Sequence, residues 1–104
     1  MVDPAELEPD DRVLFLGVPD FGVIAACAAR LTEGLVVAMG DDKAIREARK
    51  AGRDLDNVMF VPATPDNIPW GDGFFTRVID LVGSWPDPDR TRSEIQRVTT
   101  LPKE

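Results

Sequence analysis

The sequence predicts an α/β fold, a Rossmann-like three-layer unit in which helices flank a mostly parallel sheet of about four strands. Two observations lead to this prediction. Short continuous apolar runs, typical of strands covered on both faces, alternate with longer segments of helical pattern. This alternating order favours parallel strands joined by right-handed crossovers. Because the sequence contains no internal repeat or linker, we expect a single domain over residues 1–104.

The first part of the chain is expected to alternate twice between strand and helix. An Asp-Pro pair suits the start of a short helical turn over residues 3–8. Val13 to Leu16 is an apolar run that Gly17 ends, which predicts the first strand. Residues 21–31 are rich in alanine and apolar on nearly every face, which predicts a helix packed on the sheet. Residues 35–39 form a second apolar strand.

The second part of the chain opens with two acidic residues. Asp41 and Asp42 stand at the N-terminus of a helix expected over residues 43–50, whose basic residues lie toward its C-terminus, as the helix dipole favours. The remaining elements are a third strand over 58–61, a rigid proline-containing loop over 62–73, a fourth strand supplied by Phe74-Phe75 and residues 78–82, and a polar helix over 88–98.

The net charge and the apolar pattern of the sequence limit the kinds of partner that we expect. The formal charge of −7 repels nucleic-acid phosphates and anionic lipids, so we expect neither nucleic acid nor a membrane surface as a partner. No apolar run reaches the roughly 20 residues of a membrane span, and the acidic start, Met1 to Asp10, differs from a signal peptide. A cytoplasmic location is therefore expected. The single cysteine, Cys27, cannot form an internal disulfide and is interpreted as a small buried hydrophobic residue.

Missing residue types limit the chemistry. The sequence contains no histidine and no tyrosine, so it cannot form a Ser-His-Asp or Cys-His triad or a Cys/His zinc site. We therefore assign no catalytic residue and no metal ligand. Any catalysis would depend on Asp, Glu, Lys or Cys27.

Four segments, in order and at characteristic spacings, resemble class I S-adenosylmethionine-dependent methyltransferases of the small-molecule, type 11-like kind. The resemblance extends from about Asp11 to Thr99 and implies the strand order 3-2-1-4 and a site for S-adenosylmethionine. The segments are Asp11 to Gly17, Gly34 to Met39, Asn57 to Val61 with Ile68 to Phe75, and Pro86 to Arg90 with Glu94 to Val98.

The first cofactor motif departs from the family pattern. The glycine loop G-x-G-x-G is matched by residues 17–21, where Gly17 is kept but proline and phenylalanine occupy the other two glycine positions. Pro19 removes an N–H, and Phe21 is expected to add a large ring where the ligand would lie. Gly22 is an alternative third glycine, shifted by one position.

Two further cofactor positions also differ. The acidic residue that holds the ribose in the family is matched by Gly40, and the adjacent Asp41 either replaces it or caps the following helix. The family's Gly-Asp after the third strand is matched by Ala63-Thr64, whose hydroxyl is a weaker acceptor for the adenine amino group. A loss of about 1–2 kcal/mol at each of the three positions would lower the affinity by nearly three orders of magnitude.

The C-terminal end and the tryptophans leave alternatives open. Thr99 to Glu104 stands where the family has a KPGG turn and three more strands, so we expect a truncated domain with its fourth strand at an edge. Such an edge favours a homodimer through Val78, Asp80 and Val82. Asp80 is interpreted as a guard against aggregation or as a remnant of the methyl-acceptor site. Trp70 and Trp85 either cover the core or line a ligand or partner surface.

Two functional hypotheses follow. The leading one is a truncated methyltransferase-like domain without catalysis that acts as an interaction or assembly module and has no cofactor. The alternative is an active methyltransferase or S-adenosylmethionine-binding protein completed by homodimerisation, with Gly17, Gly22, Asp41 and Thr64 at the cofactor. Methyl transfer depends mainly on alignment of acceptor and methyl group, so the absence of a histidine base does not exclude it.

Overall fold

The computed structural model describes residues 7–81 and 86–100. Within them the chain folds into the expected alternation of strands and helices, with bounds close to those predicted. The elements are β1 (Arg12–Leu16), α1 (Phe21–Arg30), β2 (Leu35–Gly40), α2 (Asp42–Ala51), β3 (Val58–Pro62), β4 (Arg77–Asp80) and α3 (Pro88–Val98).

Two of the expected elements differ or lie partly outside the described residues. Residues 7 and 8, the described part of the predicted N-terminal turn, are not helical. The fourth strand covers only Arg77–Asp80, because Phe74 and Phe75 precede it; Phe75 instead forms a bridge with Thr99. Val82, Trp85 and residues 3–6 lie outside the described residues.

The four strands form one parallel sheet in the order β3-β2-β1-β4, as predicted. β1 is central, so Phe15 lies opposite Ala38 on one side and Ile79 on the other. The start of β2 approaches the chain before β1 very closely: a Cβ atom on Gly34 would lie 2.0 Å from the backbone oxygen of Asp11. Only glycine fits at this position without a shift of the backbone.

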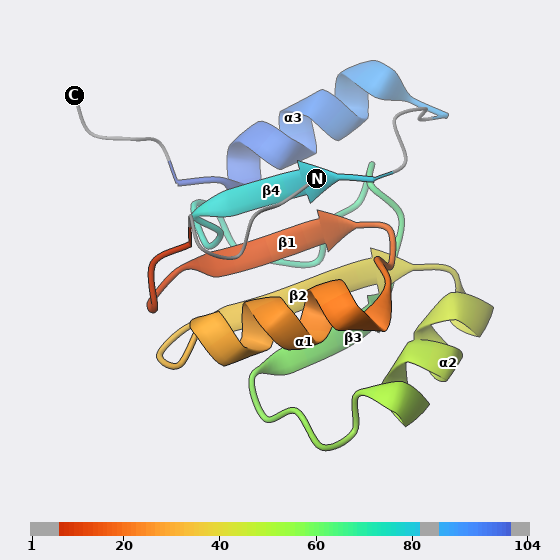
Figure 1. Ribbon diagram of the computed structural model, residues 1–104. Coiled ribbons are helices and arrows are strands. Elements are labelled where there is room, and N and C mark those ends of the chain that lie inside the picture. Colours follow the sequence, from red (N-terminus) through yellow and green to blue (C-terminus); the bar gives the residue numbers. More distant parts are fainter. Residues whose placement is uncertain (1–6, 82–85, 101–104) are drawn as a thin grey trace.

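Helices cover both faces of the sheet (Figure 1), with α1 and α2 on one face and α3 on the other. Side chains alternate along each strand, so Val13 and Phe15 pack under α1 while Leu14 and Leu16 pack toward α3. The two cores give the three-layer arrangement that the apolar runs predict. Cys27 is fully buried in the α1 core, and burial raises the pKa of its thiol, which confirms its interpretation as a structural residue.

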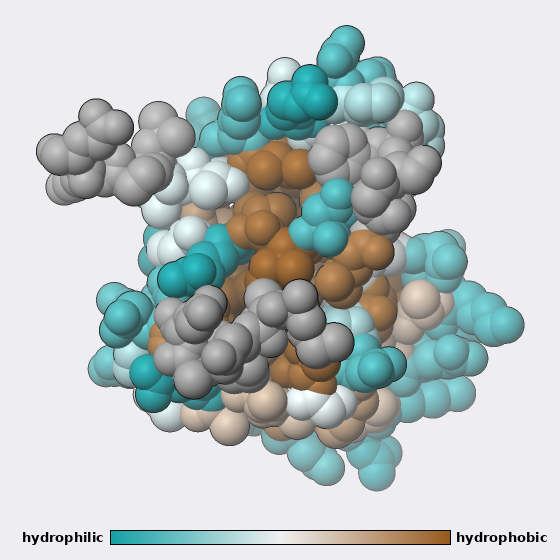
Figure 2. Space-filling model, turned by 45° about the horizontal axis from the view of Figure 1, so that its top comes forward, coloured by the Kyte–Doolittle hydropathy of each residue, from teal (hydrophilic) through white to brown (hydrophobic). Residues whose placement is uncertain are grey.

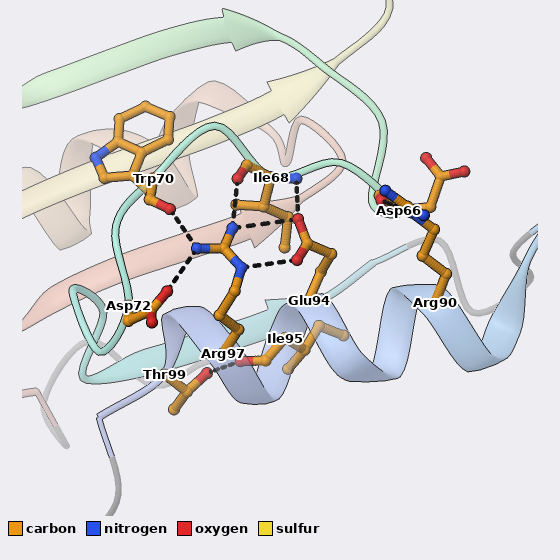
Figure 3. Close-up of polar contacts among 9 residues, drawn as sticks. All are labelled: Asp66, Ile68, Trp70, Asp72, Arg90, Glu94, Ile95, Arg97 and Thr99. Carbon is orange, nitrogen blue, oxygen red and sulfur yellow. Dashed lines mark hydrogen bonds and ion pairs between the residues drawn. The ribbon is translucent and has the colours of Figure 1, made fainter.

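A charged network fixes the long connection between β3 and β4 against α3 (Figure 3). Arg97 donates to the backbone oxygens of Ile68 and Trp70, both at 2.8 Å, and to the carboxylates of Asp72 and Glu94. The second Glu94 oxygen accepts from the Ile68 N–H at 2.9 Å. The hydrogen bond from Arg97 is the main reason why the pKa of Glu94 lies below its ordinary value. These contacts hold part of the connection, from Ile68 to Asp72, against α3.

Trp70 belongs to an aromatic cluster beside this network. Its ring lies 5.5 Å from that of Phe75 and 6.4 Å from that of Phe74, between ring centroids. Both Trp70 and Phe74 pack against the α3-side core, where Phe75 is fully buried. Trp70 therefore covers the core, which is the first of its two expected roles.

Candidate functional site

A crevice of about 510 Å³ opens where β1, β2 and β3 end. Parallel strands present their carboxyl ends at the same edge of a sheet, so the residues after each strand meet there. Gly17 follows β1, residues 40–42 end β2 and begin α2, and residues 62–65 end β3 and continue beyond it; all of them line the crevice. Leu16 and Met39 add apolar surface, and Pro86 closes one side.

Three of the four cofactor positions predicted from the sequence meet in this crevice. Gly17, Asp41 and Thr64 all line it, although they are far apart in the chain. Gly22 does not line it: this residue lies exposed in the first turn of α1, and a Cβ atom built there would meet nothing within 4 Å. The structure therefore gives no geometric reason for glycine at this position.

Gly17 is held in a backbone conformation that L-residues rarely adopt, with φ of 109°. Its N–H donates to the backbone oxygen of Met39 at 2.9 Å, which joins the end of β1 to the end of β2. The chain makes its sharp turn at this residue. The backbone conformation alone therefore explains why position 17 is a glycine, whether or not a ligand binds.

Pro19 and Phe21, expected beside the ligand, do not line the crevice. After the turn at Gly17 the chain passes to the α1 side of the sheet, and both residues line a separate cleft there with Ile24 and Phe60. Phe21 begins α1 and is 44% exposed. The substitutions in the glycine loop therefore leave the crevice open.

Asp41 is the N-cap of α2, and its Oδ1 accepts from the N–H of Ala44 at 2.8 Å. Helix capping, one of the two interpretations of this residue, is confirmed. Asp42 also lines the crevice, which the sequence assigned only to the helix terminus. Two exposed carboxylates at the mouth favour ligand groups that donate hydrogen bonds, such as hydroxyls and amines, and oppose phosphates.

Thr64 follows β3, in a turn that Asn67 closes by donating its N–H to the Thr64 backbone oxygen at 3.0 Å. The Thr64 hydroxyl donates to Oδ1 of Asp66 at 2.6 Å. Because its proton is engaged, this hydroxyl oxygen can only accept further hydrogen bonds, and the charged partner strengthens it as an acceptor. Asp66 is not among the residues predicted from the sequence, although a carboxylate two residues after a threonine in a proline-bounded turn is a signal for such a contact.

The crevice has the size and lining of a small-molecule site. Its volume lies within the usual range of ligand pockets, and its lining is apolar with a few polar groups. Within residues 7–81 and 86–100, no three His, Cys, Asp or Glu side chains lie together as a metal site would need. In the same residues no helix is long and apolar enough to cross a membrane.

No protein-family model matches the sequence, and no curated protein matches it either. Solved structures with the same fold are found readily. A SAM-dependent methyltransferase from Aquifex aeolicus has a TM-score of 0.81 at 18% identity, over 94% of this chain and 58% of its own. YcgJ from Bacillus subtilis has a TM-score of 0.79 at 19% identity, over 92% of this chain and 42% of its own.

A third similar structure is a complex with the demethylated cofactor. Geranyl diphosphate C-methyltransferase from Streptomyces coelicolor, solved with S-adenosyl-L-homocysteine, has a TM-score of 0.76 at 18% identity, over 89% of this chain and 35% of its own. The chain thus spans about half or less of the length of these three proteins. At such identities the similarity establishes the fold alone: this chain has the Rossmann-like fold of class I methyltransferases.

Proposed function

We propose that this chain is a methyltransferase-like domain whose crevice binds the adenosyl part of S-adenosylmethionine or S-adenosylhomocysteine, with low affinity and without catalysis by its own residues. The observation that carries this proposal is the open crevice at the strand ends, where Gly17, Asp41 and Thr64 meet. The fold shared with SAM-dependent methyltransferases supports it.

The polar groups suit an adenosine better than a nucleotide phosphate. The carboxylates of Asp41 and Asp42 are acceptors for ribose hydroxyls, and the Thr64 oxygen is an acceptor for an adenine amino group. Asp41 already uses one oxygen to cap α2, and Thr64 carries no charge of its own. Each contact is therefore weaker than one to an uncommitted carboxylate, and we expect a dissociation constant of about 0.1–1 mM.

Calorimetric titration of the full chain with S-adenosylhomocysteine tests the proposal. Thr64→Val keeps the shape of the side chain but removes the acceptor, and Asp41→Asn keeps a cap but removes the charge. Each variant is expected to weaken binding about 5- to 10-fold. Thr32→Val, at an exposed turn outside the crevice, is the matched control and should bind as the wild type does. Absence of saturable heat at 5 mM ligand would refute the proposal.

Self-association is a second candidate function, because β4 is an edge strand of the described sheet. Figure 2 shows a band of apolar surface on the side of the molecule where β4 and α3 come forward. Leu81, directly after β4, is 47% exposed, and Val78 is partly exposed. A homodimer through this edge would bury both residues and bring the exposed Asp80, which lies between them in the sequence, into or beside the interface.

Light scattering of the purified chain separates the two states. A homodimer has twice the monomer mass of 11.4 kDa. Leu81→Lys should shift the mass toward the monomer, whereas Met59→Lys should not, because Met59 is equally exposed but lies on β3 at the opposite edge. A wild-type chain that stays monomeric at about 1 mM would contradict the assembly role.

A further inference from the structure

Helices α1 and α2 lie on the same face of the sheet (Figure 1). A second cleft, of about 380 Å³, is lined by residues from the start of α1 and along α2. It is separate from the crevice at the strand ends, since no residue lines both. Its floor is apolar, formed by Ile24 and Phe60. Three alanines of α2, at positions 44, 48 and 51, leave the space open because their side chains are short.

The wall of this cleft is built from the residues that depart from the glycine loop. Pro19 and Phe21 both line it. Phe21 is 44% exposed, although it begins a helix that packs on the sheet. The ring therefore presents aromatic surface to whatever enters the cleft.

The charged side chains that line the cleft are all negative. Asp20 and Glu47 line it, and no Lys or Arg does. Asp20 occupies the N-cap position of α1, yet its side chain makes no capping hydrogen bond. Within residues 7–81 and 86–100, neither carboxylate forms a hydrogen bond or ion pair in the structure. Both charges are thus available to a ligand in the cleft.

From these three features we propose that the cleft between α1 and α2 is a second binding site, and that it takes a small organic ammonium ion with a hydrophobic body. The body would lie on Ile24, Ala48 and Phe60, and the ammonium would lie near Asp20 and Glu47. An exposed aromatic ring attracts a cation through its π-face, so Phe21 favours the same ligand. This proposal is independent of what the crevice binds.

Two probes of matched shape test the charge and the location together. 2-Phenylethylammonium and neutral 2-phenylethanol are titrated into the ¹⁵N-labelled full chain, and the backbone amide shifts are followed. We expect saturable shifts at Phe21, Gly22 and Ala48 with the ammonium, at a dissociation constant of about 1 mM, and binding at least about 5-fold weaker with the alcohol. Equal binding of the two probes, or ammonium shifts confined to Gly17 and Asp41, would overturn the proposal.

Variants assign the contribution of each group. Glu47→Gln and Asp20→Asn should each weaken binding of the ammonium about 3- to 5-fold. Phe21→Leu should reduce the preference for the ammonium over the alcohol. Glu33→Gln, an equal change of charge at an exposed residue that does not line the cleft, is the matched control and should leave the affinity unchanged. A loss as large in Glu33→Gln would reduce the effect to net charge and refute the site.

Discussion

Arg97 illustrates how one residue positions a whole segment. Its guanidinium donates to two carboxylates and to two backbone oxygens of the connection between β3 and β4. Ile68, in this connection, is buried, so its backbone oxygen would lose its partner without water to replace it. The same connection begins with Ala63, Thr64 and Pro65, which line the crevice, so the network anchors the segment that follows them.

Removal of the Arg97 guanidinium is expected to destabilise the fold. Arg97→Met keeps most of the apolar stem but none of the donors, and should lower the free energy of unfolding by about 2–3 kcal/mol. Arg97→Lys should lose less, since it keeps the charge but not the planar donor set. Urea unfolding measures both, with Arg92→Met, an exposed arginine on the same helix, as the control expected within about 0.5 kcal/mol of wild type.

Asp11 makes stability depend on pH in the acid range. Burial raises the pKa of its carboxyl, but the hydrogen bonds from the Glu8 N–H and the Thr76 hydroxyl and the charge of Arg77 outweigh this, so the pKa is lowered overall. A carboxyl whose pKa is lower in the folded than in the unfolded chain stabilises the fold above its unfolded pKa of about 4, and this contribution disappears as pH falls through the folded pKa.

Asp11→Asn should therefore cost stability mainly at neutral pH. We expect a loss of about 1–2 kcal/mol at pH 7 and a smaller loss at pH 3, so that the free energy of unfolding falls less steeply below pH 4 than in the wild type. The exposed neighbour offers a matched control, Asp10→Asn, which should leave the slope as it is. An equal slope in wild type and Asp11→Asn would show that other groups cause the acid sensitivity.

Within the helices and strands, alanine substitutions at two glycines are expected to have opposite effects on stability. Gly34→Ala would place a Cβ atom 2.0 Å from the Asp11 oxygen, so β1 and β2 would have to separate, and we expect a loss of at least about 2 kcal/mol. Gly22→Ala meets open space in α1 and should stabilise the helix by up to about 1 kcal/mol. Thermal unfolding distinguishes them; a destabilising Gly22→Ala would mean that this glycine has a role the geometry does not show.

The strands and helices could be predicted from the sequence because buried parallel strands are continuous apolar runs and the helices between them carry alanine or dipole-matched charges. The side of the sheet on which Phe21 lies could not be predicted from the sequence. It depends on the backbone turn at Gly17 rather than on the type of residue at position 21. The contact between Thr64 and Asp66 depends in the same way on the turn that Asn67 closes. The sequence predicts Asp42 only as a residue of the helix N-terminus. Its position at the crevice depends on the pairing of β3 with β2, which the sequence around Asp42 does not show.

At the scale of the whole molecule, the turn from Gly17 to Phe21 separates two cavities. The crevice on one side carries the acceptors for an adenosine, and the cleft on the other carries an aromatic ring and two carboxylates. Both cavities are negatively charged in a molecule of net charge −7, so neither suits a phosphate-rich partner. The crevice lies at the carboxyl ends of the strands, whereas the cleft extends along α2.

An NMR titration of the ¹⁵N-labelled chain with S-adenosylhomocysteine shows whether the crevice is an adenosyl site. We expect saturable shifts at the amides of Gly17, Asp41 and Thr64, with Gly22 and Ala48 unmoved. Absence of shifts at these three amides up to 5 mM ligand, or shifts confined to the cleft between α1 and α2, would contradict it.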